Sequence, residues 1–244
     1  MRVTVAIPAY DEITSLAAVV AEALAELDAI GLARDGEVLI VDDGSTDGTS
    51  ALADDLARSN PNVRVVHHRA NRGFSGAMRT CFRESRGDWI FLAPADGQSS
   101  MSDLRRFLEA SSDADIVIGV RESRADHAGR RFLSHAFHLI ARSLLAIPVR
   151  EFSSILLFRR SLLDSMTLRS RDNGATMLPE VLFRAHARGA VLVSVVVPHF
   201  PRRSGQAKGG RLSVVLITLV ELGRIAVLVR IDEMRRVGRV KTQP

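Results

Sequence analysis

Cysteine, lysine and the larger aromatic residues are scarce in this chain of 244 residues. Cys81 is the only cysteine, which excludes an internal disulfide framework and a cysteine-rich zinc site and fits a reducing compartment. Lysine occupies only positions 208 and 241, so arginine supplies 31 of the 33 basic residues. Tyr10 and Trp89 are the only tyrosine and tryptophan. Because a basic and aromatic platform is missing, we do not expect nucleic acid as a partner.

Long apolar runs are missing as well. The longest stretch without an acidic or basic side chain, residues 189–201, has 13 residues, whereas a membrane-spanning helix needs about 20. Residues 1–8 carry one charge and a short apolar run that ends at proline, so no signal peptide is expected. We therefore expect a cytoplasmic protein that is soluble or lies on a membrane surface.

The composition is otherwise that of a globular protein, with 46% hydrophobic and 25% charged residues and a formal net charge of +5. Arginine grips phosphate through paired hydrogen bonds, so its excess points toward phosphorylated ligands, acidic lipid surfaces or nucleic acid. Coding bias alone would produce the same excess.

Short apolar runs alternate with segments of helical spacing. The runs predict strands, buried on both faces, at residues 3–7, 38–41, 63–66, 89–92 and 116–120. The succession of strand, helix and strand in steps of about 25 to 30 residues is typical of parallel βαβ units. We therefore predict an α/β fold with a Rossmann-like, mostly parallel sheet and helices on both faces. Beyond residue 125 the pattern is weaker and predicts a helix at 131–145, an apolar strand at 155–158, a helix at 178–187 and a strand at 190–197.

The loops after the predicted strands are rich in Asp, Gly and Asn, and ligands of such sheets bind beyond the carboxyl ends of the strands. Asp42 and Asp43 follow the second strand, where a carboxylate can accept hydrogen bonds from a ribose or a base. A tight turn with a helix cap is the alternative, but it does not explain two adjacent acids. Asp96 and Gln98 follow the fourth strand and offer the hard oxygen ligands that suit Mg²⁺ or Mn²⁺. A solvated Asp-Gly turn explains that loop equally well.

Four motifs in this order resemble family 2 glycosyltransferases of the GT-A fold, and most of all their dolichyl- or polyprenyl-phosphate mannosyltransferase-like branch. They are IPAYDE at 7–12, VDDGSTDGT at 41–49, NRGFSGA at 71–77, and GD at 87–88 followed by DGQ at 96–98. The resemblance implies a nucleotide-sugar donor bound by Asp43, which holds the base or ribose, and by Pro8, Ala9, Tyr10, Glu12 and Gly73. It also implies that Asp96 and Gln98 bind the metal and the diphosphate.

The later part of the chain resembles the same branch more loosely. Gly119-Val120-Arg121 matches its Gly-x-Arg element, and Arg130 with Ser134 matches its Arg-x-x-x-Ser element for the acceptor phosphate. Asp96, Arg121, Arg130 and Ser134 are thereby implied as catalytic residues. The segment 197–205 resembles the loop that closes over the diphosphate, which implies diphosphate binding by Arg202, Arg203 and Lys208.

The chain departs from the family pattern at two places. Pro94 stands where the metal motif usually has its first acid, and Arg150, followed by Glu151, stands where the central motif has Asp. The departures leave a non-catalytic nucleotide-sugar-binding module as an alternative.

Direct displacement at the sugar's anomeric carbon needs an attacking oxygen, a stabilised leaving diphosphate and exclusion of water. A sugar hydroxyl as acceptor would need a general base, for which Glu151 and Glu180 are the choices. A lipid phosphate is already anionic and needs cations, which Arg121, Arg124 and Arg130 supply. The leading hypothesis is therefore an inverting enzyme that moves a hexose from a GDP- or UDP-linked sugar to polyprenyl phosphate, with Mg²⁺ or Mn²⁺, at the inner face of the cytoplasmic membrane. Transfer to a sugar hydroxyl of a glycolipid or polysaccharide is the alternative.

The C-terminal part differs in character from the rest. Residues 212–229 are apolar except for Glu221 and Arg224, and arginines follow from Arg230 onward. Such a helix suits the surface of an anionic membrane, to which the protein would bind peripherally. Packing against the chain's own core and a homodimer contact are equally good explanations. We thus expect one GT-A domain at 1–210, with a nucleotide-binding half at 1–120 and an acceptor half at 121–210, followed by an amphipathic helix and basic tail at 211–244.

Overall fold

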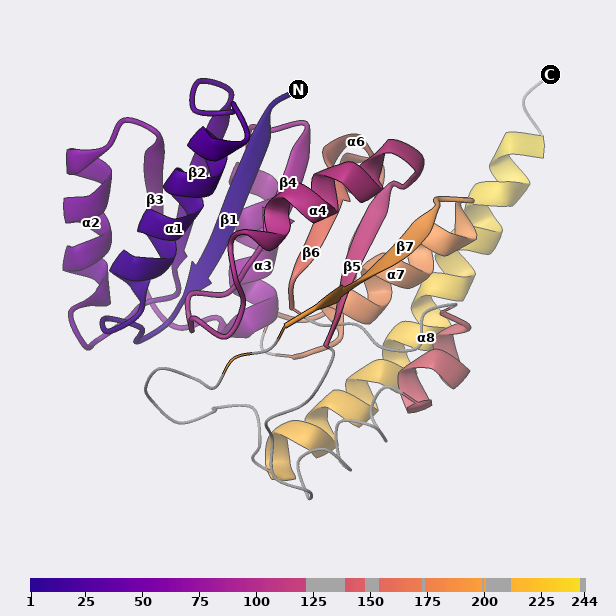
Figure 1. The fold of residues 1–244 in the computed structure, drawn as a ribbon. Helices are drawn as coiled ribbons and strands as arrows, with labels where there is room; N and C mark the ends of the chain where they lie inside the picture. The colour runs from indigo at the N-terminus through magenta and orange to yellow at the C-terminus, as the bar shows by residue number, and fades with distance from the viewer. Residues whose placement is uncertain (122–138, 148–153, 173, 199, 201–211, 242–244) are drawn as a thin grey trace.

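The computed structural model describes residues 1–121, 139–147, 154–172, 174–198, 200 and 212–241, with the side chains of the last helix described at 218–236. Within these residues the fold is built on a seven-stranded sheet with the order β3-β2-β1-β4-β6-β5-β7 (Figure 1). The strands are β1 (Val3–Ala9), β2 (Gly36–Asp42), β3 (Val63–His67), β4 (Trp89–Leu92), β5 (Ile116–Arg121), β6 (Leu156–Arg159) and β7 (Leu192–Val197).

The sheet is mostly parallel, as predicted. β1 pairs in parallel with β2 and β4, β2 with β3, and β5 with β7, whereas β6 runs antiparallel between β4 and β5. All the parallel strands therefore end at one edge of the sheet, which we call the carboxyl edge, and begin at the opposite amino edge. β6 starts at the carboxyl edge, since Leu156 pairs with Leu92 near the end of β4.

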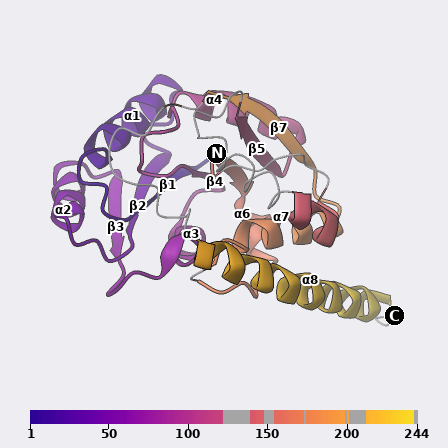
Figure 2. The ribbon, with the colours of Figure 1, turned by 90° about the horizontal axis from the view of Figure 1, so that it is seen from below.

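Helices cover both faces of the sheet, also as predicted (Figure 2). Successive side chains of a strand point to opposite faces, so each strand contributes to two apolar clusters. The helices α1 (Leu16–Ala29), α2 (Thr49–Ser59) and α4 (Asp103–Ala110) pack on one face. The helices α3 (Gly73–Glu84), α6 (Arg160–Asp164), α7 (Met177–Ala187) and α8 (Leu212–Lys241) pack on the other.

The C-terminal helix α8 belongs to the core of the domain. Its buried apolar side chains, Leu222, Ile225, Ala226 and Val229, recur at three- and four-residue spacing and join the cluster of α3 and α7. Of the explanations that the sequence left open, packing against the chain's own core is therefore confirmed for this face. In the part of the chain that the structure describes, no helix has the length and apolar character needed to cross a membrane.

A buried set of charges joins α7 to α8. The Arg184 side chain is only 1% exposed, and its guanidinium lies 2.8 Å from Glu180, 2.9 Å from Asp232 and 3.3 Å from Glu233. Glu233 also pairs at 3.0 Å with Arg188, the residue that follows α7. Each charge has a partner of opposite sign, so burial does not leave it uncompensated. The pairs fix how α8 lies on the domain.

We expect Arg184→Met to lower the free energy of unfolding by about 3 to 5 kcal/mol, because it leaves the buried Glu180 without its cation. Urea denaturation followed by circular dichroism measures the loss. The matched control is Arg235→Met on the exposed side of α8, for which we expect a change within about 0.5 kcal/mol. Equal small losses in both variants would show that the buried charges do not stabilise the α7–α8 contact.

Candidate active site

Hydrogen bonds join the loop after β1 to the loop after β2 at the carboxyl edge. Asp11 has a φ of +50°, and its N–H donates to Ser45 Oγ at 3.0 Å while its Oδ1 accepts from the Thr46 N–H at 2.9 Å. The N–H of Glu12 donates to Thr49 Oγ1 at 2.9 Å. The motif residues at 10–12 and 42–49 therefore form one connected surface.

Gly44 is required by the close approach of a third loop. Its φ is +73°, and a Cβ atom at this position would lie 2.7 Å from the backbone carbon of Ala70. A side chain would thus be both strained and in collision with backbone. Glycine lets the loop after β3 pack directly on the loop after β2.

Asp43 is buried, with 2% of its surface exposed, and holds the start of α3 in place. Its Oδ1 accepts from the Arg72 N–H at 2.9 Å and lies 2.6 Å from His68 Nδ1, and its Oδ2 accepts from the Gly73 N–H at 2.8 Å. The backbone N–H of Asp43 donates to Ala9 O at 2.9 Å. Two predicted nucleotide-binding residues, Ala9 and Gly73, are therefore in direct contact with Asp43.

Two histidines at the end of β3 were not among the predicted site residues. His67 pairs in register with Asp42, and the two side chains are 2.8 Å apart, while His68 contacts Asp43 and Thr80. The sequence could have indicated this contact, since Asp42-Asp43 and His67-His68 each follow an apolar run that predicts a strand. Parallel neighbours in register bring such pairs together.

The pairing shifts the pKa of both partners. Burial alone would raise the pKa of Asp42, but hydrogen bonds from Ser45, Ser50 and His67 outweigh it and hold the pKa below its ordinary value. Burial alone would lower the pKa of His67, but its contacts with Asp42 and Asp54 raise it. The pair therefore favours a charged imidazolium beside a charged carboxylate.

The loop after β4 carries Asp96 and Gln98, the predicted metal ligands. The N–H of Gln98 donates to Asp96 Oδ1 at 3.1 Å, and Gly97 between them has a φ of +67°. The N–H of Ala95 donates to Pro8 O at 3.3 Å, so this loop lies beside the end of β1. Gln98 O accepts from the Phe200 N–H at 3.0 Å, which ties the loop to the segment after β7.

The donor atoms of this loop suit a hard divalent cation. Asp96 supplies a carboxylate oxygen, Oδ2, that accepts no hydrogen bond from the described residues, and Gln98 supplies an amide oxygen. Among those residues no group of three or more His, Cys, Asp or Glu side chains could hold a metal ion. Two protein ligands fit a cation that is shared with the phosphates of a bound nucleotide, and they do not form a closed structural site.

The other residues that the sequence predicts to bind the nucleotide lie at the same edge. Pro8 and Ala9 end β1, Tyr10 follows half-buried, and Glu12 is buried, with its carboxylate 3.2 Å from Ser15 Oγ. Their contacts with a nucleotide remain a prediction. Gly73 has a φ of +81° and begins α3.

Arg121 ends β5, opposite Val197 of β7, and thus also reaches the carboxyl edge. β6 separates β5 from β4, so Arg121 lies on the far side of β6 from the loop of Asp96. The remaining predicted site residues lie outside the described part of the chain: Arg130, Ser134, Arg202, Arg203 and Lys208.

A loop from the later half of the chain binds the start of α3. Asp172 pairs with Arg79 at 3.0 Å and with Arg72, and its backbone oxygen accepts from the Gly76 N–H at 3.1 Å. Ser75 Oγ donates to Gly174 O at 2.5 Å. The start of α3 is therefore bound both by Asp43 and by Asp172 and Gly174, which belong to the expected acceptor half.

Glu180 is not available as a general base, which corrects one of the two choices made from the sequence. It has no exposed surface. Its carboxylate accepts from the N–H groups of Arg169 and Ser170 at 2.7 Å each and from Arg184 Nε at 2.8 Å. These bonds give Glu180 a structural role. Glu151, the other choice, lies outside the described residues.

Comparison of the sequence with known proteins identifies a family and relatives. The family model for glycosyl transferase family 2 matches residues 4–178. An undecaprenyl-phosphate mannosyltransferase of Micrococcus luteus is 30% identical over 242 residues, which cover 93% of this chain and 96% of the relative. An undecaprenyl-phosphate 4-deoxy-4-formamido-L-arabinose transferase of Pseudomonas fluorescens is 31% identical over 209 residues, or 84% of this chain. The chain spans 59% of the length of that second relative.

Solved structures with the same fold were also found. Glucosyl-3-phosphoglycerate synthase from Mycobacterium tuberculosis, in complex with uridine diphosphate, matches with a TM-score of 0.66 and 18% identity over 91% of this chain and 80% of that one. A mannosyltransferase from Pyrobaculum calidifontis, in complex with GDP-Man and Mn²⁺, matches with a TM-score of 0.61 and 18% identity over 93% and 73%. At this identity the likeness shows the fold alone, and it confirms the predicted GT-A fold.

The contacts of His67 predict a pH-dependent stability. Its pKa in the folded chain lies above the ordinary 6.5, so its stabilising effect is complete below pH 6.5 and is lost as the pH rises through the raised pKa. We expect the wild type to have a higher Tm than His67→Gln at about pH 6 and the difference to shrink toward about pH 8.

Thermal unfolding of both proteins across this range measures the effect. His186→Gln, at an exposed position on α7, controls for the loss of a histidine as such. A difference between wild type and His67→Gln that stays constant or grows with pH would contradict the assignment.

Proposed function

The chain belongs to glycosyl transferase family 2, and from this premise we propose that it transfers a hexose from a GDP- or UDP-linked donor to polyprenyl phosphate with inversion at the anomeric carbon. The observation that carries the proposal is the likeness to two transferases whose names specify undecaprenyl phosphate. Their different sugars, mannose and a formamido-arabinose, leave the sugar itself open.

The reaction is a displacement at the anomeric carbon of the sugar. A phosphate oxygen of the acceptor forms the new bond to that carbon while its bond to the donor diphosphate breaks, and the nucleoside diphosphate leaves. The chain must hold the two reactants in line, keep water out and stabilise the charge on the leaving group. Because the attacking oxygen is already anionic at neutral pH, no general base is needed. The burial of Glu180 is compatible with this mechanism and removes one of the two bases considered for the sugar-hydroxyl alternative.

The donor would bind at the carboxyl edge over β1, β2 and β4. Asp43 keeps acceptor capacity on Oδ2, which receives one hydrogen bond, and would receive a hydrogen bond from the base or ribose. Asp96 and Gln98 would hold Mg²⁺ or Mn²⁺, which when bound supplies positive charge to the leaving diphosphate. Arg202, Arg203 and Lys208, which follow Phe200 in the sequence, would add charge.

The acceptor phosphate would bind to Arg121, with Arg130 and Ser134. Guanidinium groups suit it because they offer paired donors to a phosphate and stay charged at all relevant pH values. The position of Arg121 at the same edge as Asp96 supports this assignment.

A peripheral place at the inner face of the membrane is part of the proposal. Large apolar side chains are exposed at seven-residue spacing along one side of α8: Val220, Val227 and Met234. Others are exposed on the helical segment 139–145: Leu139, Ile140 and Leu144. Arg230 of α8 contacts this segment by donating a hydrogen bond to Leu144 O. Exposed apolar surface beside arginine is typical of helices that lie in the interface of an anionic membrane.

The test of the proposed reaction is incubation with a panel of GDP- and UDP-sugars, a short polyprenyl phosphate and Mn²⁺, followed by mass spectrometry of the lipid. We expect one donor to give a lipid-phosphate sugar, and EDTA to abolish the product. The same panel with a polyprenol that lacks the phosphate should give no product. If no donor glycosylates the lipid phosphate, the proposed acceptor is wrong, and binding of a nucleotide sugar without turnover would favour the non-catalytic module.

Asp96 is the residue whose loss should affect this reaction most directly. We expect Asp96→Ala to lower kcat/KM by about 100-fold or more, because charge stabilisation of the leaving group is lost. Asp96→Asn keeps the size and the hydrogen-bond acceptor but removes the charge, so it should be nearly as impaired. Asp113→Ala, at an exposed position near the amino edge, is the control and should keep full activity. Normal turnover by Asp96→Ala would remove Asp96 from the mechanism.

A further inference from the structure

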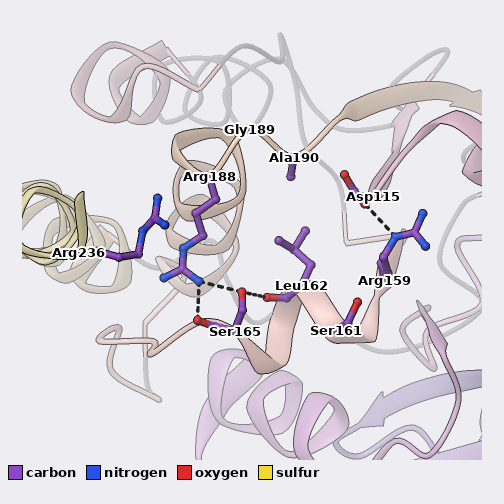
Figure 3. A pocket seen from close by; sticks show the side chains of 9 residues that line it. All are labelled: Asp115, Arg159, Ser161, Leu162, Ser165, Arg188, Gly189, Ala190 and Arg236. Atoms are coloured by element: carbon purple, nitrogen blue, oxygen red, sulfur yellow. Dashed lines mark hydrogen bonds and ion pairs between the residues drawn. The ribbon is translucent and has the colours of Figure 1, made fainter. Parts of the chain in front are cut away.

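A cavity of about 500 Å³ opens at the amino edge of the sheet, on the side opposite the candidate active site (Figure 3). Its wall is built from the residue before β5, the end of β6, helix α6 with the residue after it, residues 188–190 just after α7, and helix α8. The volume lies in the range of small-molecule sites, about 300 to 1,000 Å³. Of the residues assigned to the donor, the metal or the acceptor, those that the structure describes do not line it.

Arg159 marks one end of the cavity. Its Nε donates to Asp115 Oδ1 at 2.8 Å and its Nη2 to Ala114 O at 3.3 Å, and the guanidinium lies 4.6 Å from the centre of the Trp89 ring. Stacking on the ring and the bond to Asp115 hold the guanidinium in one orientation. Its Nη1 donates to no described residue. Ser161, whose hydroxyl also has no partner among them, lies on the adjacent wall.

Arg188 and Arg236 mark the other end of the cavity (Figure 3). Both pair with the carboxylate of Glu233. Arg188 lies 3.0 Å from Glu233 and also donates to Ser165 Oγ at 2.8 Å, whereas Arg236 uses only Nε, which donates to Glu233 at 2.7 Å. Neither terminal nitrogen of Arg236 has an acceptor among the described residues.

Positive charge is therefore in excess in this cavity. Among the described residues, three guanidinium groups line it, of Arg159, Arg188 and Arg236, together with the carboxylate of Asp115. Glu233, which pairs with Arg188 and Arg236, supplies the second carboxylate from outside the lining. Glu233 is in addition shared with Arg184 of the buried network. Serine hydroxyls and fixed arginines with unused N–H groups are what proteins offer to phosphate oxygens.

We propose that this cavity is a second anion site that binds a phosphate group, at the opposite edge of the sheet from the proposed transfer reaction. The group belongs to a free phosphorylated molecule or to the headgroup of an anionic lipid, since both present the same oxygens. Arg236 makes the principal contact because its terminal nitrogens are unused, and Arg188 adds charge next to it. The site does not depend on the proposed function.

Equilibrium dialysis measures binding at this site directly. Titration with inorganic phosphate at constant ionic strength should show saturable binding with a Kd of about 1 mM or lower. Asp96→Ala should bind phosphate in this cavity as the wild type does, which separates the site from the proposed donor site.

Arg236→Gln and Arg235→Gln form the matched pair, since the two positions are neighbours on α8 and both are exposed in part. We expect Arg236→Gln to weaken phosphate binding about tenfold or more and Arg235→Gln to leave it unchanged. Thermal unfolding checks that both variants fold, which is expected because Glu233 keeps Arg184 and Arg188 as partners.

A second arm identifies the source of the phosphate. Vesicles of phosphatidylcholine alone are compared with equimolar phosphatidylcholine and phosphatidylglycerol. Selective loss of binding to the anionic vesicles by Arg236→Gln assigns the site to a lipid headgroup, and loss of inorganic phosphate binding alone assigns it to a free phosphorylated molecule. The proposal is overturned if neither phosphate nor anionic vesicles distinguish Arg236→Gln from Arg235→Gln.

Discussion

The buried carboxylate of Asp43 is the interaction on which the geometry of the candidate active site depends. It receives the first N–H groups of α3 and contacts His68, while its own N–H bonds the end of β1. Three separate loops are thereby fixed around one charge. A carboxyl group with 2% exposure is tolerated because these partners replace its hydrogen bonds to water. The same bonds orient Gly73 and Ala9, so the surface at which we propose that a nucleotide binds is largely preformed.

The later half of the chain is fixed by a different set of charges. Arg184 and its acidic partners hold α8 against α7, and Asp172 holds the following loop against α3. The C-terminal helix is thus part of the domain and not a separate appendage. Because its inner face is committed to the core, the proposed membrane contact falls to the outer apolar side chains of its described part, such as Val220 and Val227. The outer surface therefore has a fixed position relative to the carboxyl edge.

The sequence was sufficient for the strands and for the edge of the sheet at which the described candidate residues gather. Buried strands are continuous apolar runs, so the predicted strand at 38–41 lies within β2 (Gly36–Asp42), and parallel strands carry their loops to one edge. The roles of Asp43 and Asp96 came from family resemblance, because local pattern alone left simple turns as alternatives. The antiparallel insertion of β6 was not predictable, since strand pairing between distant segments leaves no local periodicity.

Burial of charged residues was the other feature that the sequence did not show. Glu180 looked like an available base, although Arg184 four residues later could have suggested an ion pair.

The proposed function places the nucleotide-sugar donor at the carboxyl edge. Mn²⁺ anomalous scattering from crystals grown with a nucleoside diphosphate tests this placement most directly. We predict one manganese peak at ligand distance, about 2.0 to 2.3 Å, from the Asp96 carboxylate, with the base over β1 and β2 near Asp43. Manganese bound away from Asp96, or a nucleotide bound elsewhere than the carboxyl edge, would contradict the account.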